Sequence, residues 1–206
     1  MISKYSKLIY NETLNKEELV MNIWHRADPS KIKPDEFLSC IEISKGSKNK
    51  YELDKYSGAL KLDRILYTAT HYPQNYGFIP RTLAADGDAL DVLVLCSEPI
   101  IPLAIVECYP IGLLEMIDGG SKDAKILAIA KNDPVYNSFC DISQIPDHIL
   151  KEIRHFFQVY KQLEGKETVV DEIKNRDCAL KIIQKCIDAY IEKFGVDPIL
   201  EYRKEE

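Results

Sequence analysis

Three aspartates, Asp86, Asp88 and Asp91, lie within six residues of one another and could bind a hard cation. Gly87 between them is a turn-forming residue, and the apolar residues 90–95 that follow predict a buried strand. Carboxylates this close together repel one another unless a cation lies between them. The spacing therefore fits two interpretations, an oxygen-rich metal site at the start of a rigid strand or a solvated acidic turn.

An EF-hand calcium loop does not fit the same spacing. Counted from Asp86, the sixth position of such a loop needs glycine and the twelfth needs glutamate. This chain has Asp91 and Ser97 at those positions. Residues elsewhere in the chain are needed to choose between the metal site and the solvated acidic turn.

Further charged and phenolic side chains could complete a metal and phosphate site. The acids are Glu42, Glu52, Asp86, Asp88, Asp91, Asp118 and Asp123; the cations are Lys50, Arg64, Lys125 and Lys161; the phenols are Tyr72, Tyr76 and Tyr160. The carboxylates could hold several divalent ions, and the Lys, Arg and Tyr side chains could bind phosphate oxygens. Although the chain has a net charge of −6, metals at the site would let it bind a polyanionic substrate.

Length and composition narrow the class of protein. The 206 residues predict one domain, 1–206. The acidic balance argues against nucleic acid as a partner. Since no leader and no apolar run of about 18 residues is present, we expect no membrane partner and a cytoplasmic protein. The six cysteines are scattered without a C-x-x-C pair, so we expect reduced, mostly buried thiols and no zinc site.

The first two thirds of the chain predict an N-terminal arm followed by short strands. In the arm, residues 1–38, we expect a short helix near 16–21 and a packing anchor at Trp24. Residues 72–80 contain two prolines, which predict a loop or edge, and residues 118–125 form a second acidic loop around a Gly-Gly pair. The predicted strands are residues 37–43, 50–53, 60–66, 90–95, 105–108 and 125–130.

The last third predicts two helices, within residues 147–194. The first covers about 147–163 and is stopped by Gly165, and the second covers 175–194 and ends at Gly195. Strands first and helices afterwards indicate an α+β fold. We expect a small closed antiparallel β-barrel of the OB type over residues 37–130, flanked by the C-terminal helices.

The identity and order of these residues strongly resemble the family I soluble inorganic pyrophosphatases. One position departs from the family pattern: Ala89 stands at a turn position where proline or glutamate is usual. The match spans about Asn22 to Glu164. Its motifs are Trp24-His25, Glu42-Ile43, residues 45–55 (KGSKNKYELDK), Leu62-Asp63-Arg64, residues 72–80 (YPQNYGFIP), residues 86–94 (DGDALDVLV), Pro110-Ile111-Gly112, Asp118 through Lys125, His155-Phe156-Phe157 and Tyr160-Lys161.

The resemblance implies a role for each site residue. Metal ligands would be Asp86, Asp91, Asp118 and Asp123, with Asp91 bridging two ions, and Asp88 would be the general base. Phosphate oxygens would contact Lys50, Arg64, Tyr76, Tyr160 and Lys161, while Glu42, Glu52, Tyr72 and Lys125 would have supporting roles. The resemblance also implies pyrophosphate as substrate, several Mg²⁺ ions per active site with Mn²⁺ as a substitute, and a homo-oligomer, a hexamer as in many bacterial members.

The chemistry of phosphoanhydride hydrolysis calls for such a set. It needs a water made nucleophilic near neutral pH by metal ions, an uncommitted carboxylate to accept its proton, and cations for the charge that grows on the leaving group. All-oxygen ligands favour magnesium over zinc. Two alternatives stay open on the residues alone: a metal-dependent phosphatase acting on organic phosphates, and a small OB-type barrel that binds single-stranded nucleic acid.

Overall fold

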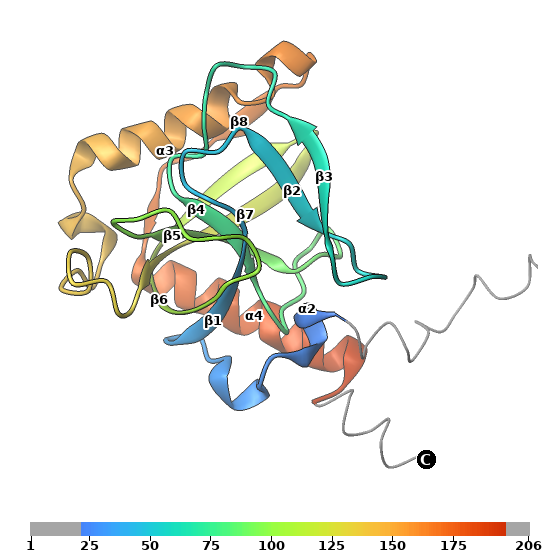
Figure 1. Cartoon of the computed structure of the whole chain (residues 1–206). Helices are drawn as coiled ribbons and strands as arrows, with labels where there is room; N and C mark the ends of the chain where they lie inside the picture. The colour runs from blue at the N-terminus through green and yellow to red at the C-terminus, as the bar shows by residue number, and fades with distance from the viewer. Residues whose placement is uncertain (1–21, 197–206) are drawn as a thin grey trace, which may run out of the picture.

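The structure, a computed structural model, describes residues 22–196, so the helix expected near residues 16–21 lies outside the described part. After one short helix, seven strands come first along the described chain, and the two long helices follow with two short strands between them (Figure 1). The strands are β1 (Phe37–Ile43), β2 (Asn49–Leu53), β3 (Leu60–Ile65), β4 (Asn75–Ile79), β5 (Leu90–Leu95), β6 (Ile105–Asp118), β7 (Ser121–Ala130), β8 (Thr168–Val170) and β9 (Lys174–Asn175). The helices are α2 (Ile23–Arg26), α3 (Asp147–Val159) and α4 (Arg176–Phe194), with 3-10 turns η2 (Pro29–Lys31), η3 (Ile142–Gln144) and η4 (Gln162–Glu164).

Five strands close into a barrel. Their order is β1-β4-β5-β7-β6, and β6 pairs back with β1. The predicted α+β class and the closed barrel are confirmed. The sheet is not purely antiparallel, however, because β5 and β7 run parallel. The long strand β6 lies between them in the chain and provides the crossover that a parallel pair requires.

The hairpin of β2 and β3 is not part of the barrel, contrary to the prediction for residues 50–53 and 60–66. Among the described residues the two strands form a separate two-stranded sheet. Figure 1 shows this hairpin standing beside the barrel. Most of its residues are exposed or half-buried, because charged and polar side chains point to both of its faces.

Strand β4 corrects the expectation of a loop or edge at residues 72–80. Pro73 and Pro80 flank the strand instead of interrupting it, and all of its residues are buried between β1 and β5. Gly77 is needed at its centre because a Cβ there would overlap the carbonyl oxygen of Cys40 on β1. The glycine thus permits close approach of two strands and does not mark a loop.

The second acidic segment, residues 118–125, is also strand and not loop. Strand β6 continues to Asp118, Gly119 and Gly120 turn with φ of 56° and 85°, and β7 begins at Ser121. The ladder pairs Met116 with Asp123. The acids of this segment therefore stand on a long, hydrogen-bonded hairpin.

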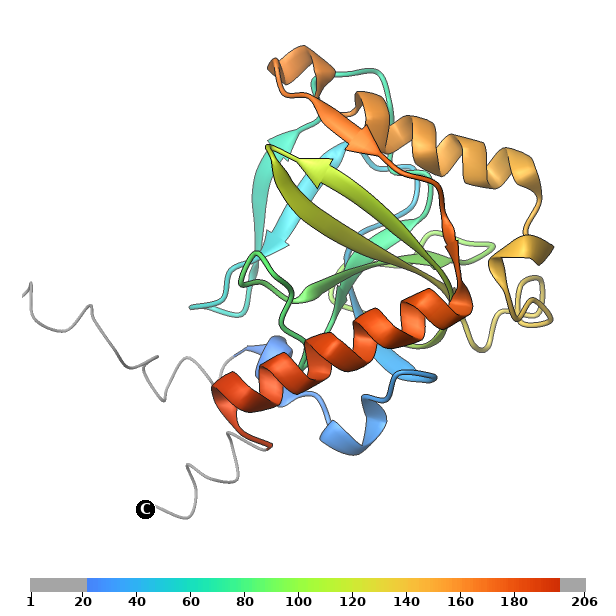
Figure 2. The ribbon, with the colours of Figure 1, turned by 180° about the vertical axis from the view of Figure 1, so that it is seen from behind.

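The two helices cover different parts of the barrel and are close to their predicted bounds. Helix α3 buries Ile153, Phe156 and Phe157, and the one-turn η4 follows it. Helix α4 begins where the Asn175 side chain accepts a hydrogen bond from the Cys178 amide. Figures 1 and 2 show α3 and α4 at opposite ends of the barrel. Within residues 22–196, no helix combines the length and apolar character needed to cross a membrane.

Trp24 anchors the arm, as predicted. It is buried, its indole N–H donates to the Thr82 carbonyl oxygen at 2.8 Å, and its ring lies against Phe194 of α4. All six cysteines are free thiols. Burial raises the pKa of the Cys40 and Cys108 thiols to about 12, so these two are packing residues with little thiolate at neutral pH.

Candidate active site

One cavity of about 580 Å³ collects the predicted site residues, with two exceptions. Arg64 and Tyr72 are not among the residues that line it. The others come from both walls: the barrel strands β1 and β4 to β7 on one side, and the β2–β3 hairpin and the segment after α3 on the other. The predicted residues in the lining are Glu42, Lys50, Glu52, Tyr76, Asp86, Asp88, Asp91, Asp118, Asp123, Lys125, Tyr160 and Lys161.

The acidic turn before β5 is held by short local hydrogen bonds. Asp86 Oδ1 accepts from the Asp88 amide at 3.0 Å, and Asp88 Oδ1 accepts from the Ala89 amide at 2.8 Å. The Thr82 hydroxyl accepts from the Leu90 amide at 2.8 Å and so fixes the first residue of the strand. Proline has no amide hydrogen and could not donate to Asp88 in this way. Ala89 can, so this departure from the family pattern is compatible with the turn.

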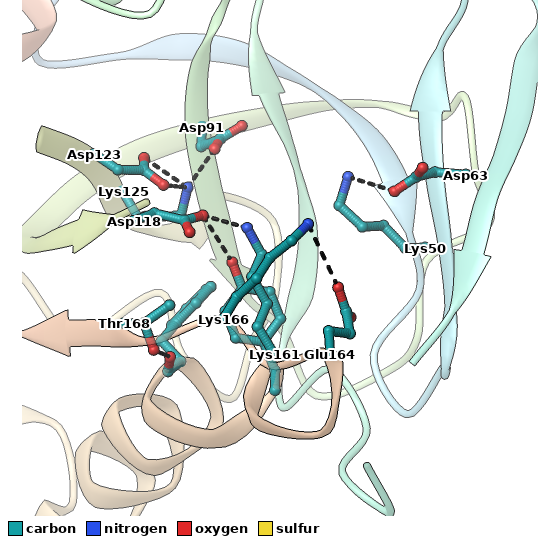
Figure 3. A network of polar contacts seen from close by, with 12 residues as sticks. Lys50, Asp63, Asp91, Asp118, Asp123, Lys125, Lys161, Glu164, Lys166 and Thr168 are labelled. Carbon is teal, nitrogen blue, oxygen red and sulfur yellow. Dashed lines mark hydrogen bonds and ion pairs between the residues drawn. The ribbon is translucent and has the colours of Figure 1, made fainter. Parts of the chain in front are cut away.

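Lys125 joins two acids of the barrel wall. Its ammonium contacts Asp91 Oδ2 at 2.5 Å and Asp123 Oδ2 at 2.7 Å (Figure 3). Burial would lower the pKa of Lys125, but the adjacent Asp91 and Asp123 charges outweigh it and hold that pKa above its usual value. Lys161 pairs in the same way with Asp118, to which the Tyr160 hydroxyl also donates at 3.4 Å.

The barrel wall fits divalent cations by its donor chemistry. Neither histidine nor cysteine is among the described residues lining the cavity, so its ligands are hard oxygens of the kind that Mg²⁺ and Mn²⁺ prefer. Burial raises the pKa of Asp123; Lys125 opposes this shift, and the charges of Asp91 and Asp118 add to it. A cation among these carboxylates would relieve their repulsion.

The lysines also shape the arrangement of the acids. In residues 22–196, no three His, Cys, Asp or Glu side chains converge on a single point suited to a metal. Lys125 lies between Asp91 and Asp123, and Lys161 takes Asp118. Binding of ions by these acids would therefore require the two ammonium groups to move away from them.

A chain of ion pairs links the hairpin wall to the segment after α3. Lys50 contacts Glu52 and, at 3.3 Å, Asp63. Asp63 contacts Arg64 Nη1 at 2.5 Å, and Arg64 Nε donates to Glu164 Oε1 at 2.8 Å. Burial alone would lower the pKa of Arg64, yet Glu164 and Asp63 raise it. The guanidinium is thus held by two carboxylates, and none of the three residues is part of the cavity lining.

Glu42 and Tyr72 support the site from behind. Glu42 on β1 accepts a hydrogen bond from the Leu53 amide at 2.7 Å and so ties the barrel to the hairpin. Burial raises the pKa of Glu42 to about 8; the Leu53 bond opposes this shift and the Asp91 charge adds to it. Tyr72 is almost fully buried, with its ring 5.3 Å from that of Tyr76. Its place is behind Tyr76 and not in the cavity.

Several polar residues in or beside the cavity escaped the sequence-based prediction, and three of them make ion pairs with predicted residues. Lys55, at the tip of the hairpin, contacts Asp88 Oδ1 at 2.8 Å and lies over the Trp24 ring. Asp63 and Glu164 complete the ion-pair chain described above. Asp63 could have been predicted from the sequence, because it directly precedes the predicted phosphate contact Arg64. Lys55 and Glu164 depend on partners far away in the sequence, which a local pattern does not reveal.

Comparison with known proteins places the chain among enzymes of one kind. The profile of the family described as inorganic pyrophosphatase matches residues 39–191. The chain is 47% identical over 180 residues to soluble inorganic pyrophosphatase PPA1 of Solanum tuberosum, covering 87% of this chain and 85% of that protein. It is 48% identical over 172 residues to soluble inorganic pyrophosphatase 2 of Chlamydomonas reinhardtii, covering 83% and 89%.

Solved structures give the same result at the level of the fold. The inorganic pyrophosphatase of Helicobacter pylori is similar with a TM-score of 0.75 and 43% identity, over 77% of this chain and 95% of that one. The inorganic pyrophosphatase of Thermus thermophilus is similar with a TM-score of 0.78 and 40% identity, over 82% and 98%. The likeness therefore includes both the barrel and the helices that pack on it.

Proposed function

The chain belongs to the inorganic pyrophosphatase family and hydrolyses pyrophosphate to two phosphates, and we propose that it does so between an acidic barrel wall that holds magnesium and a cationic wall that holds the phosphates. One observation carries this proposal: acidic and basic side chains line the same cavity. The acids are Asp86, Asp91, Asp118 and Asp123, and the bases are Lys50 and Lys161. Acids alone would repel the substrate, and cations alone would leave no metal ligands.

The four aspartates of the barrel wall are the proposed ligands of the divalent ions. Bound there, the ions would lower the pKa of the attacking water and offset phosphate charge. The coarser property, dependence on metal, follows from the family; magnesium, with manganese as a substitute, is supported by the all-oxygen donor set. Asp91 and Asp123 would exchange their contact with Lys125 for contact with metal.

Asp88 is the proposed general base. It stands in the acidic turn beside the metal ligands, and more than half of its side-chain surface is exposed toward the cavity and solvent. A carboxylate that is not fully engaged by metal can accept the proton that water loses on attacking phosphorus. Lys55, at 2.8 Å, keeps a positive charge next to that carboxylate.

The remaining residues hold the two phosphates. Lys50 and Arg64 come from the hairpin, and Tyr160 and Lys161 come from the end of α3. Tyr76 reaches the cavity from β4. When the bridging P–O bond breaks, negative charge collects on the leaving phosphate, and these donors stabilise it. The four supporting residues act around these contacts: Glu42 ties the barrel to the hairpin, Glu52 pairs with Lys50, Lys125 pairs with Asp91 and Asp123, and Tyr72 packs behind Tyr76.

The experiment that tests the proposal is phosphate release from pyrophosphate, with magnesium and with excess chelator. We expect turnover with magnesium and none with chelator. Nucleoside triphosphates and a phosphomonoester should be cleaved far more slowly, which separates this activity from that of a general phosphatase. Asp147→Asn, an exposed change on α3, serves as the matched control and should leave the rate unchanged. Equal rates on organic phosphates would contradict the proposal.

Assembly and compartment complete the proposal. A homohexamer is supported by the family and by apolar side chains left exposed on and before β6, among them Ile101 and Ile105. A cytoplasmic location is supported by the free thiols. Light scattering of the purified protein would test the first, and fractionation of cells would test the second.

A further inference from the structure

The single turn after α3 carries a buried carboxylate that the reaction scheme above does not use. In η4, Leu163 is 66% exposed, whereas the Glu164 side chain is only 8% exposed. This is the reverse of the usual preference, since burial of a charge is unfavourable unless it is paired. Such an arrangement indicates that Glu164 has a specific partner to hold.

That partner is Arg64 on β3. Glu164 Oε1 accepts from Arg64 Nε at 2.8 Å, and Asp63 takes Nη1 at 2.5 Å. Within the described part of the chain, the buried Nη2 atom of Arg64 has no hydrogen-bond partner. A buried guanidinium nitrogen without a partner is unfavourable in a protein that only needs to fold. The two carboxylates therefore fix the guanidinium through Nε and Nη1, and Nη2 is the donor nitrogen that stays without a partner within residues 22–196.

The same turn also places Lys161, the residue on which η4 begins. Lys161 reaches Asp118 on the barrel wall, while Glu164 reaches Arg64 on the hairpin wall. Figure 3 shows Glu164 and Lys161 on this turn, opposite Lys50 and Asp63. One turn of chain thus connects the proposed phosphate contacts Lys161 and Arg64 with each other and, through Asp118, with the barrel wall, which shares no strand pairing with the hairpin among the described residues.

We propose that Glu164 is a positioning residue for pyrophosphate hydrolysis: its bond to Nε fixes the orientation of the Arg64 guanidinium, and with it the phosphate contact that Arg64 makes. The proposal rests on the proposed function, because it takes Arg64 as a phosphate contact. Loss of Glu164 would leave the charge of Arg64 intact but free its side chain to turn. Small misplacement of such a contact can lower the rate by about 100-fold.

The test is a double-mutant cycle on kcat/KM for pyrophosphate, using Glu164→Gln, Arg64→Gln and the double variant with magnesium present. We expect Glu164→Gln to lower kcat/KM by about 10- to 100-fold, mostly through a higher KM. In the Arg64→Gln background the same change should alter it by less than about 3-fold, because the residue it positions is gone. Glu167→Gln, an exposed neighbour, is the matched control and should stay within about 2-fold of the parent.

Three outcomes of the double-mutant cycle would contradict the proposal. An equal loss from Glu164→Gln in both backgrounds would overturn positioning through Arg64, and so would a Glu164→Gln variant as active as the parent. If Arg64→Gln itself kept full activity, the assignment of Arg64 as a phosphate contact would fall, and the positioning role with it. Should Glu164→Gln fail to fold, the cycle is run with Glu164→Asp and Arg64→Lys, which keep both charges, and the same coupling is expected.

Discussion

The two walls of the cavity are built in different ways. The barrel wall bears its acids on β5, β6 and β7, strands that pair with one another and whose inner residues, such as Leu93 and Leu127, are fully buried. The hairpin wall bears Lys50 and Arg64 on a two-stranded sheet that is largely exposed or half-buried. Backbone ladders fix the first wall, and mainly side-chain contacts fix the second.

This difference separates two properties of the protein. Metal ligands require fixed geometry, and a packed barrel supplies it. The position of the hairpin, which bears proposed phosphate contacts, depends on a few interactions: Glu42 with the Leu53 amide, Asn22 with the Lys55 carbonyl oxygen, and Arg64 with Glu164. Changes in the barrel should therefore affect stability most, and changes in the hairpin should affect substrate affinity most.

The largest effect on stability is expected in the barrel. Leu93→Ala removes a fully buried side chain from β5 and should lower the free energy of unfolding by about 2 to 5 kcal/mol, through lost burial and the cavity left behind. Leu62→Ala on the hairpin, where the leucine is 49% exposed, is the matched control and should lower it by less than about 1 kcal/mol. Denaturant titration measures both. Equal losses of unfolding free energy in the two variants would contradict the claim that the barrel contributes more to stability than the hairpin.

The arm that anchors the hairpin tip should be sensitive to acid. Burial lowers the pKa of His25 to about 4, Arg81 and Lys55 adding to the shift, and its Nδ1 lies 2.6 Å from the Tyr190 hydroxyl. Since the folded-state pKa lies below the unfolded value, this stability is fully present above pH 6.5 and is lost as the pH falls through 4. Between pH 7 and 4.5 the loss should be roughly 2 to 3 kcal/mol.

Denaturant titrations of His25→Gln at the two pH values test this directly. The variant should start less stable at pH 7 and should lose roughly 2 kcal/mol less than the parent on acidification. His148→Gln, a change at an exposed histidine on α3, should keep the full pH dependence. An unchanged pH dependence in His25→Gln would show that another group is responsible.

A change in the hairpin should affect substrate and spare the fold. Lys50→Gln removes a proposed charged phosphate contact and should lower kcat/KM by roughly 10- to 100-fold, the scale of one charge-assisted hydrogen bond. The free energy of unfolding should change by about 1 kcal/mol or less, because the carboxylate partners of Lys50, Glu52 and Asp63, are 56% and 32% exposed and can be solvated without it. Lys151→Gln, exposed on α3, is the control. A Lys50→Gln variant with intact kinetics but a weakened fold would reverse the comparison.

The smallest effect is expected at the hairpin tip. The ion pair of Lys55 with Asp88 is about half exposed on both sides, and such pairs contribute about 0 to 1 kcal/mol. Lys55→Gln should therefore change kcat by no more than about 5-fold, and the difference should shrink with added salt. A loss above about 100-fold would place Lys55 among the residues that take part in the chemistry.

Much of the barrel could be predicted from the sequence, because its strands are short and carry strong local patterns. The first strand, residues 37–43, and the second helix were predicted to within a residue. Strand β4 was missed because prolines at both ends and Gly77 in the middle are loop signals. Only the approach of Cys40 on β1 explains that glycine. The extent of β6 and β7 was missed because Gly119 and Gly120 form a tight turn inside an acidic segment.

The site was predicted unevenly for a related reason. Acids that share a turn or a hairpin, such as Asp86 and Asp91, can be recognised in the sequence because they are only a few residues apart. The structure brings them to one cavity. Arg64 was expected among the phosphate contacts but does not line that cavity, and its guanidinium is paired with Asp63 and Glu164 instead. Glu164 lies 100 residues from Arg64 in the sequence. Contacts of that kind follow from the fold and not from a local pattern.

The central claim is that neighbouring acids of one turn have different roles, Asp91 as a metal ligand and Asp88 as the base. Magnesium titration of Asp91→Asn and Asp88→Asn, followed by calorimetry and by steady-state rate, tests it most directly. Asp91→Asn should bind magnesium more weakly and regain part of its activity at high magnesium. Asp88→Asn should bind magnesium normally and turn over about 10²- to 10⁴-fold more slowly at every concentration. If magnesium restored Asp88→Asn and not Asp91→Asn, the two roles would be assigned the wrong way round.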